Sequence, residues 1–390
     1  MAPSSPRRLV ALALPPGPRV LDALRAAWDG GDAVAPLAPD VPDALLRVLV
    51  DELRPHRLVT ATGVHDLPAG RPVADDVAVV VATSGSTGAP KGVELTRAAL
   101  EASARAATAR LGADAGDRWL CCVPVSHVAG IGVLVRALIA GRAPVVHERF
   151  DVAAVARERD ATLVSLVPTM LRRLLEAGAD VAHWRAILLG GAAAPRALLD
   201  RAAAAGARVV RSYGATETCG GCVYDGVPLD GVAVATADDG RISVRGPVLM
   251  HGYRGRPELT ARALSDGWFE TGDVGRFDDG GRLEVLGRAD DVVVTGGEKV
   301  HPARVAALLE EHPGVRAAAV VGRPDPEWGQ RVVAVVVPSG ARPPSLDDLR
   351  TFVRIRAARH EAPRELVVVD ELPLLPSGKV DAARALGAAG

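Results

Sequence analysis

The chain has 390 residues and a mass of 40.3 kDa, and it carries 46 basic against 47 acidic side chains. This length predicts about two to three domains with a sizeable core. A formal net charge of -1 and a pI near 6.8 provide no basic field for a polyanion, which argues against nucleic acid or a membrane surface as the main partner. We therefore expect a soluble enzyme or a binder of small molecules.

The N-terminal segment and the cysteines point to the cytoplasm. Two arginines precede a short apolar stretch, but Pro15, Pro16 and Pro18 interrupt it, so we expect an ordinary cytosolic N-terminus rather than a signal peptide. No apolar run reaches the ~20 residues of a membrane-spanning helix. Four cysteines are too few for a disulfide scaffold. The spacing of Cys219 and Cys222 would suit a redox pair or half a zinc site, but without a second pair we expect two small residues that line a pocket.

The first two thirds of the chain alternate short apolar runs with alanine-rich stretches. The runs at 77–82, 163–167, 187–189 and 209–210 predict buried strands, and 97–111, 169–177 and 196–205 predict helices. This alternation is typical of an α/β fold in which helices cover both faces of a sheet. After about residue 230, the alternating segments 241–244 and 282–286 flank Gly and Asp turns and predict antiparallel hairpins.

The C-terminal part predicts a small α+β unit of its own. Its strands are expected at 292–294, 317–321, 332–337 and 366–369, and its helices at 302–311 and 345–360. The predicted division is a large N-terminal domain at 1–289 and a small C-terminal domain at 290–390. The charged residues between Glu310 and Arg316 are interpreted as ordinary helix surface.

Lysine is scarce in this arginine-rich chain. Lys91, Lys299 and Lys379 are the only lysines among 46 basic residues, and each lies in a glycine-containing stretch. An ammonium group is a compact point charge that meets a phosphate or carboxylate end-on. We therefore expect these lysines to contact anionic groups, the alternative being three chance survivors on the surface.

The strongest local signal is the loop that follows the strand at 77–82. An apolar strand leads into hydroxyl residues, glycines and one lysine, a composition that places backbone and side-chain donors around a triphosphate. The loop differs from the common P-loop because Pro90 precedes the lysine and Gly92 follows it. The expected phosphate ligands are Thr83, Ser84, Gly85, Ser86, Thr87, Gly88 and Lys91.

This loop, TSGSTGAPKG, resembles the phosphate loop of the adenylate-forming superfamily of acyl-CoA synthetases. Five further motifs follow in the order that this superfamily shows: GGAAAP at 190–195, SYGATE at 212–217, WFETGD at 268–273, GRADD at 287–291 and PSGK at 376–379. The resemblance covers residues 77–381, and six motifs in order are very specific. The phosphate loop begins early in the chain, so the N-terminal subdomain is abbreviated.

The resemblance implies a role for each motif. Lys379 is expected to be the catalytic lysine, Thr216 to bond phosphate, Glu217 to hold Mg²⁺, and Asp290 to act as the hinge between the domains. ATP, Mg²⁺ and CoA are the implied cofactors and co-substrates. The remaining expected nucleotide and CoA contacts are Gly190, Gly191, Ala192, Ser212, Tyr213, Gly214, Asp273, Arg288 and Lys299.

Two further segments resemble one group within the superfamily. Residues 124–136 and 218–226 are most similar to the compact actinobacterial form of the 2-succinylbenzoate–CoA ligases of menaquinone synthesis. His127, Arg136, Gly190 and Gly220 are then expected in the acid pocket, and His127 is also expected among the catalytic residues. The alternatives are a core histidine at 127 and a helix-surface arginine at 136.

Three other functions stay open at this point. A ligase for another aryl or acyl acid, or an enzyme that loads a carrier protein, would share every motif above. Pro90 and Gly92 argue against a P-loop kinase, and the presence of both Glu217 and Lys379 argues against a non-catalytic nucleotide-binding module. A small aromatic carboxylic acid is the expected substrate, and a homodimer is allowed.

Overall fold

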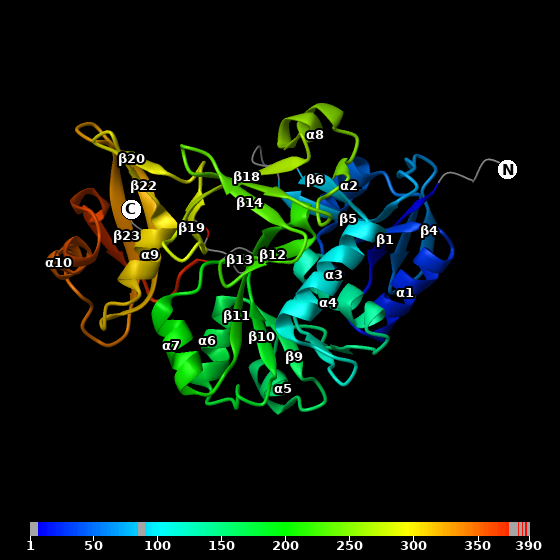
Figure 1. Ribbon diagram of the computed structural model, residues 1–390, viewed down its shortest axis with the longest axis horizontal. Helices are drawn as coiled ribbons and strands as arrows, with labels where there is room; N and C mark the ends of the chain where they lie inside the picture. Colours follow the sequence, from blue (N-terminus) through cyan, green and yellow to red (C-terminus); the bar gives the residue numbers. More distant parts are fainter. Residues whose placement is uncertain (1–6, 85–89, 374–380, 382–383, 385–386, 388–390) are drawn as a thin grey trace.

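The computed structural model describes residues 7–84, 90–373, 381, 384 and 387. Figure 1 shows the N-terminal elements in blue and cyan at one end, green elements in the middle, and the C-terminal elements in yellow to red at the other end. The expected site residues that fall outside the described part are Gly85, Ser86, Thr87, Gly88 and Lys379.

The first sheet has seven described strands in the order β16-β6-β5-β2-β1-β3-β4. Its centre is parallel because α1 and α2 connect β1 to β2 and β2 to β3. All five residues of β1 are buried, as expected of a strand covered on both faces. The elements are β1 (Leu9–Ala13), α1 (Pro18–Asp29), β2 (Ala33–Pro36), α2 (Asp43–Leu53), β3 (Arg57–Thr60), β4 (Val64–Asp66), β5 (Val77–Ser84), β6 (Pro90–Thr96) and β16 (Gly252–Tyr253).

The second sheet also has seven described strands, in the order β13-β12-β11-β10-β9-β7-β8. Helices α3 and α4 lie between the two sheets, since α3 packs on β5, β6 and β12 while α4 packs on β7 and β12 (Figure 1). The elements are α3 (Arg97–Leu111), β7 (Trp119–Cys121), α4 (Val128–Ile139), β8 (Val145–Val146), α5 (Val152–Arg157), β9 (Leu163–Leu166), α6 (Pro168–Glu176), β10 (Ala186–Leu189), α7 (Arg196–Ala204), β11 (Val209–Ala215), a 3₁₀ turn η1 (Thr216–Thr218), β12 (Gly220–Tyr224) and β13 (Val227–Pro228).

A third, antiparallel sheet joins β14, β15, β17, β18 and β19. The predicted hairpin strands are present here, since β15 and β19 both pair antiparallel with β18. This sheet brings Asp273 and Arg288 to adjacent positions on neighbouring strands. The elements are β14 (Ala233–Thr236), β15 (Arg241–Arg245), α8 (Pro257–Ala263), β17 (Leu264–Ser265), β18 (Trp268–Phe277) and β19 (Leu283–Arg288).

The C-terminal elements form a separate five-stranded sheet with its own aliphatic core. Val305 and Leu309 of α9 and Leu349 and Val353 of α10 are buried against it. In Figure 1 this unit lies beyond β19, at the end opposite to β1 and α1. Its elements are β20 (Val293–Thr295), β21 (Glu298–Val300), α9 (Pro302–Leu309), β22 (Val315–Asp325), β23 (Gly329–Pro338), α10 (Leu346–Arg356), a 3₁₀ turn η2 (Arg359–Glu361) and β24 (Glu365–Val368).

An ion pair connects α6 to this C-terminal unit. Arg172 Nη2 lies 2.9 Å from Glu310 Oε2, and Arg172 Nη1 donates to the Arg316 carbonyl at 2.8 Å. The other Glu310 oxygen accepts the Ala318 N–H at 2.9 Å, and the Glu310 side chain is only 11% exposed. The interpretation of Glu310 as helix surface is therefore wrong, because the end of α9 packs against a helix far away in the sequence. Arg316 is exposed as expected, but it lies on β22 rather than on a helix.

The four cysteines are all buried and unpaired. Burial raises the pKa of Cys222 to about 11 and that of Cys121 to about 12, so these thiols stay protonated at neutral pH. Cys219 and Cys222 lie in the apolar core beside β12. None of the helices in the described part of the chain has the length and apolarity needed to cross a membrane.

Candidate active site

Lys91, Glu217 and Tyr253 form a cluster at the edge of the first sheet. Lys91 Nζ and Tyr253 Oη both lie near one oxygen of Glu217, Oε1, at 3.2 and 2.9 Å. The Lys91 ammonium group also lies 4.0 Å from the centre of the Tyr253 ring, which is a cation–π contact. Burial and the neighbouring Glu217 raise the pKa of Tyr253, so its hydroxyl stays a donor. The cluster pairs a cation with a carboxylate, and each can pair with a charged group of a ligand instead.

Three separate elements position this cluster. Lys91 is on β6, and Tyr253 is on β16, which pairs with β6 so that Tyr253 lies opposite Val93. Glu217 is in η1, where its carbonyl accepts the Met250 N–H at 2.8 Å, just before β16. The Thr218 hydroxyl accepts the Ala215 N–H at 2.8 Å and fixes the start of this short turn. Thr216 is in the same turn.

Tyr213, Asp273 and Arg288 form a second cluster between the second and third sheets. Tyr213 on β11 donates its hydroxyl to Asp273 Oδ2 at 2.9 Å. Arg288 Nη1 donates to Asp273 Oδ1 at 3.3 Å. Burial raises the pKa of Tyr213, and the Asp273 charge raises it further, so the phenol stays neutral. A carboxylate with an aromatic ring and a guanidinium beside it can accept the hydroxyls of a ribose.

Glycines allow the backbone to approach closely between these clusters. A Cβ on Gly214 would lie 2.0 Å from the Gly220 carbonyl oxygen, and Gly220 itself has a φ of 94°. Gly190 lies beside Ser212, since its Cβ would be 3.3 Å from the Ser212 carbonyl oxygen, and Gly191 has a φ of 83°. Gly190 of GGAAAP and Ser212 of SYGATE are thus neighbours. Ala192, also in GGAAAP, is exposed.

Helix α4 begins at the site, and its middle part is buried in the core. His127 precedes its first turn and is exposed, while Val128 lies against Gly220. Arg136, two turns further, is only 7% exposed, and its guanidinium carbon lies 4.4 Å from the centre of the Trp119 ring. The alternative of Arg136 as a surface residue is therefore wrong, because α4 packs against α3, β7 and β12 and Arg136 lies on its buried face.

The other expected residues are placed as follows. Thr83 lies opposite Lys91 on β5 and its hydroxyl donates to the Lys91 carbonyl at 3.4 Å, and Ser84 ends that strand opposite Pro90. Lys299 is exposed on β21, where its charge contributes to a lowered pKa of Asp239. Asp290 is exposed in the link between β19 and β20.

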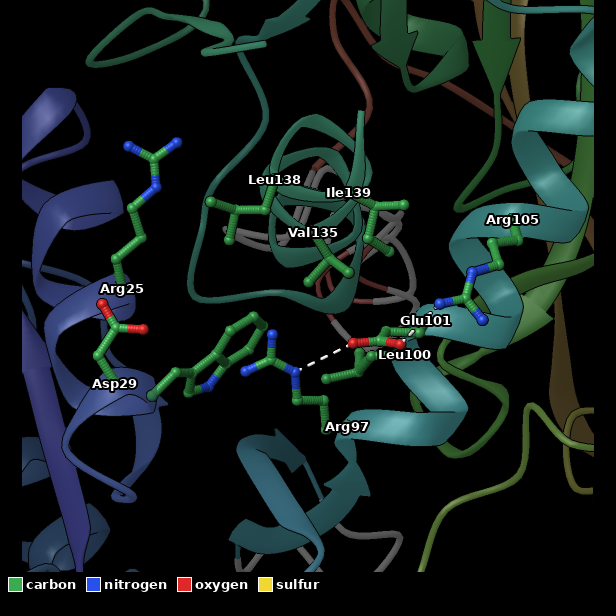
Figure 2. Close-up of a pocket in the computed structure, with 10 residues that line it drawn as sticks. Arg25, Asp29, Arg97, Leu100, Glu101, Arg105, Val135, Leu138 and Ile139 are labelled. Atoms are coloured by element: carbon green, nitrogen blue, oxygen red, sulfur yellow. Dashed lines mark hydrogen bonds and ion pairs between the residues drawn. The ribbon is translucent and has the colours of Figure 1, made fainter. Parts of the chain in front are cut away.

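An open groove of about 430 Å³ lies elsewhere, among α1, α3 and α4 (Figure 2). Leu100, Val135 and Leu138 form part of its lining, and Arg97 and Arg105 both pair with Glu101 on its rim. It contains none of the residues expected in the site. The groove reaches the end of α4 opposite to His127, so it is separate from the clusters above.

Sequence reasoning missed Tyr253, Tyr224 and the ring of Trp119. A usable signal was present, because the chain has only three tyrosines, Tyr213, Tyr224 and Tyr253. Two of them hydrogen bond to expected site residues, Asp273 and Glu217. The scarcity argument that singled out the lysines would have pointed to these rings as well.

The residues at Glu217 fit a magnesium ion that arrives with phosphates. Mg²⁺ is usually held by one or two carboxylates together with substrate phosphates. Within the described ranges there is no cluster of three or more His, Cys, Asp or Glu side chains that would bind a metal alone. Glu217, with Lys91 beside it, offers one carboxylate and one phosphate partner.

Family models identify both parts of the chain. Residues 60–254 match the model of the AMP-binding enzymes, and residues 304–379 match the model of the AMP-binding enzyme C-terminal domain. The chain belongs to the AMP-binding enzyme family. Both clusters contribute residues to the matched segments, with Lys91, Tyr213, Glu217 and Tyr253 inside the first.

Individual members of the AMP-binding enzyme family are similar over most of the chain. A probable 2-succinylbenzoate–CoA ligase from Mycobacterium tuberculosis H37Rv is 49% identical over 81% of this chain and 86% of its own length. A feruloyl-CoA synthase from an Amycolatopsis species is 37% identical over 81% of this chain and 70% of its own. The structure of o-succinylbenzoate CoA synthetase from Bacillus subtilis with its acyl-adenylate intermediate has a TM-score of 0.85 at 29% identity, and covers 97% of this chain and 88% of that one.

Proposed function

We propose that this AMP-binding enzyme is an ATP-dependent acid–CoA ligase that acts on 2-succinylbenzoate in menaquinone biosynthesis. The proposal is supported by 49% identity to a probable ligase of that name. The observation that carries the choice of acid is Arg136, a buried cation without an anionic partner in the described part of the chain, on the helix that leads away from the site. A substrate with a second carboxylate supplies that partner.

The reaction has two steps. The acid carboxylate attacks the α-phosphorus of ATP and pyrophosphate leaves, which makes a mixed anhydride from a poor acyl donor. The CoA thiol then attacks the acyl carbon and AMP leaves. The protein acts by positioning the reactants and by neutralising the phosphate charge that develops.

The two clusters divide this work. Lys91 leaves Glu217 to meet the β- and γ-phosphates, and Glu217 then holds the magnesium ion, which neutralises phosphate charge when bound. Crystals of the Bacillus subtilis synthetase contained ATP and magnesium ion. Asp273 accepts the ribose hydroxyls, Arg288 contacts ribose or phosphate, and the Tyr213 ring packs on adenine. Residues 83–88 complete the phosphate contacts.

Lys379, which lies outside the described residues, is proposed to bridge the carboxylate and the α-phosphate. Lys379→Ala should then lose acyl-adenylate formation and still convert supplied adenylate and CoA to the thioester. A pyrophosphate-release assay and a thioester assay measure the two steps separately. Equal loss in both steps would contradict this role.

A thioester assay across carboxylic acids tests the proposed function. Formation of 2-succinylbenzoyl-CoA with release of AMP and pyrophosphate supports it, and γ-phosphate release without an acid would indicate an NTPase instead. The relative named feruloyl-CoA synthase makes another aryl acid the second candidate, so ferulate belongs in the same panel. A carrier protein in place of CoA tests the alternative acceptor.

We further propose that the acid lies between His127, Gly190, Gly220 and Arg136. His127→Ala and Arg136→Ala should each weaken the preference for a dicarboxylate over an acid with one carboxylate. The cytoplasmic location and the homodimer expected from the sequence also stay proposals. Light scattering during gel filtration would measure the oligomeric state.

A further inference from the structure

Tyr224 is a buried polar residue near Arg136, and the reaction described above gives it no role. It is the last residue of β12 and is only 1% exposed, among Trp119, Ile131 and Leu134 of the apolar core. Its hydroxyl oxygen is buried, and no acceptor for its proton is found among the described residues, although the Ser212 hydroxyl lies beside it as a donor. A buried hydroxyl without a partner destabilises a folded protein by about 1–3 kcal/mol. The position therefore needs an explanation that core packing alone does not provide.

The guanidinium of Arg136 also lacks a partner for its buried polar atoms. Arg136 Nε is buried without a hydrogen-bond partner, and the side chain makes no ion pair in the described part of the chain. The groups around it are the Trp119 ring, Gly132 of its own helix, Cys121 and Tyr224. No carboxylate is among them. A cation–π contact offsets only part of the cost of burying a charge, so an anion is the missing partner.

Arg136 and Tyr224 lie at about the same distance from the contact between the start of α4 and the start of β12. Val128 of α4 lies against Gly220 of β12, since a Cβ on Gly220 would be 3.8 Å from Val128 Cγ2. From there, eight helical residues to Arg136 and four strand residues to Tyr224 both cover about 12–13 Å. The close position of the two is consistent with their electrostatic interaction, in which the Arg136 charge lowers the pKa of Tyr224 against the larger rise caused by burial. The Ser212 hydroxyl also lowers this pKa.

We propose that the Tyr224 hydroxyl donates a hydrogen bond to the carboxylate of the acid that is not activated, so that Tyr224, with Arg136, determines the preference for a dicarboxylate. This inference rests on the proposed function and names a further specificity-determining residue within it. A neutral phenol is a donor, and a carboxylate has two oxygens that can accept from a guanidinium and a hydroxyl together. Such a pair rejects an acid that lacks the second carboxylate, because both buried donors would then stay unsatisfied.

Tyr224→Phe removes the hydroxyl and keeps the ring in the core. We expect KM for 2-succinylbenzoate to rise about 10-fold, the size of a lost hydrogen bond to a charged group. KM for ATP, and the rate with an analogue that keeps the activated carboxylate but lacks the other one, should stay within about 2-fold of the wild type. The melting temperature should be close to that of the wild type, because the hydroxyl proton has no acceptor in the ligand-free protein and only the contact from Ser212 is lost.

Tyr253→Phe is the matched control, because it also removes one buried phenol oxygen but beside Glu217 rather than Arg136. It should change KM for Mg·ATP and leave the preference among acids unchanged. The inference is overturned if Tyr224→Phe keeps the wild-type preference, or if it loses activity on all acids equally with a lower melting temperature. Failure of the wild-type enzyme to form a thioester with 2-succinylbenzoate would instead overturn the proposed function, and this inference with it.

Discussion

The contact between Lys91 and Glu217 shows how single residues prepare a site for a charged ligand. In the ligand-free chain the lysine and the carboxylate neutralise each other, and the side chains are only 20% and 12% exposed. In the proposed function, binding of Mg·ATP would replace this pair by two new ones, Lys91 with phosphate and Glu217 with the metal. Little charge is left unpaired at any stage, which lowers the cost of keeping ionised groups in a half-buried place.

A substitution of Glu217 tests this exchange. Glu217→Gln keeps the shape and the acceptor for Tyr253 but removes the charge, so we expect kcat/KM for Mg·ATP to fall on the order of 100-fold, as when one preorganised electrostatic contact is lost. Pyrophosphate release measured over a magnesium titration should show a higher requirement for the metal. Glu101→Gln, in the groove of Figure 2, is the surface control. An unchanged magnesium requirement in Glu217→Gln would place the metal elsewhere.

At the scale of single elements, sequence periodicity predicted the central part of the chain well. The helix expected at 97–111 is observed as α3 with the same bounds, because Thr96 caps its first turn and Gly112 ends it with a φ of 65°. The N-terminal strands β1, β2 and β3 were not predicted. β3 has no fully buried residue, so hydrophobic patterning gives little signal there. The apolar run of β1 was considered only as a signal peptide, although all five of its residues are buried as in a central strand.

The site could be predicted only in part for a different reason. Motifs identify residues that bind a common ligand, so Lys91, Glu217, Tyr213 and Asp273 were expected together, and the structure brings them together in pairs. Contacts that depend on tertiary packing leave no local pattern. Glu310 was expected on a surface because its own helix is amphipathic, and only the position of α6 shows otherwise.

The turn before β3 provides a pH-dependent test at this scale. His56 Nδ1 accepts the Leu9 N–H at 3.2 Å, which holds β1 next to β3. Burial lowers the pKa of His56 below its ordinary value of 6.5, and the charges of Arg254 and Arg8 lower it further. The unfolded chain therefore takes up a proton first, so this contribution to stability is full above pH 6.5 and is lost as the pH falls through the folded-state pKa.

His56→Asn should remove this dependence, because the amide oxygen accepts the same N–H and does not titrate. We expect the melting temperature of the wild type to fall more than that of His56→Asn between pH 7.5 and 5.5. Calorimetry on both proteins in the same buffers checks this. Parallel curves would show that His56 makes no difference to the acid sensitivity of the fold.

At the scale of the whole molecule, the Arg172–Glu310 pair ties the two parts of the chain in the described orientation. If Lys379 acts in the first step as proposed above, the small domain would have to rotate between the steps to leave space for the CoA thiol. A rotation would break the pair and hydrate both charges. The pair therefore stabilises one orientation relative to the other, by about 1–2 kcal/mol for a partly buried charged contact, which is a factor of about 5–30 in population.

Arg172→Ala should thus change the two half-reactions in opposite directions. Stopped-flow measurement of adenylate formation, and of thioester formation from supplied adenylate, gives both rates. Arg173→Ala is the matched control, because this neighbouring side chain is exposed and its guanidinium lies 5.7 Å from the Phe150 ring within the same part of the chain. Equal changes in both rates, or none, would mean that the pair does not bias the orientation.

Asp290 is the proposed hinge, and the proposed domain boundary lies directly before it, between residues 289 and 290. It follows β19, and the neighbouring N–H groups of Ala289 and Asp291 donate to the Gly272 and Arg288 carbonyls. In the part of the chain that the structure describes, the Asp290 N–H itself makes no backbone hydrogen bond. Proline at this position therefore costs no native hydrogen bond, while it fixes φ and restricts the residue before it.

We expect Asp290→Pro to fold with a melting temperature close to that of the wild type but to lose the rotation between the two steps. Pyrophosphate release in the first turnover should persist, because the resemblance to the superfamily implies that such a substitution locks the adenylation pose, and thioester formation from supplied adenylate should slow by at least 10-fold. Asp290→Ala, which removes the same carboxylate and keeps φ free, should retain both steps. If Asp290→Pro formed the thioester at the wild-type rate, the turn would have to take place at another residue, or the second step would need no large rotation. Lys299 is exposed on β21 just beyond this link. Without the rotation, the proposal that Lys299 meets a CoA phosphate only in the second step would lose its basis.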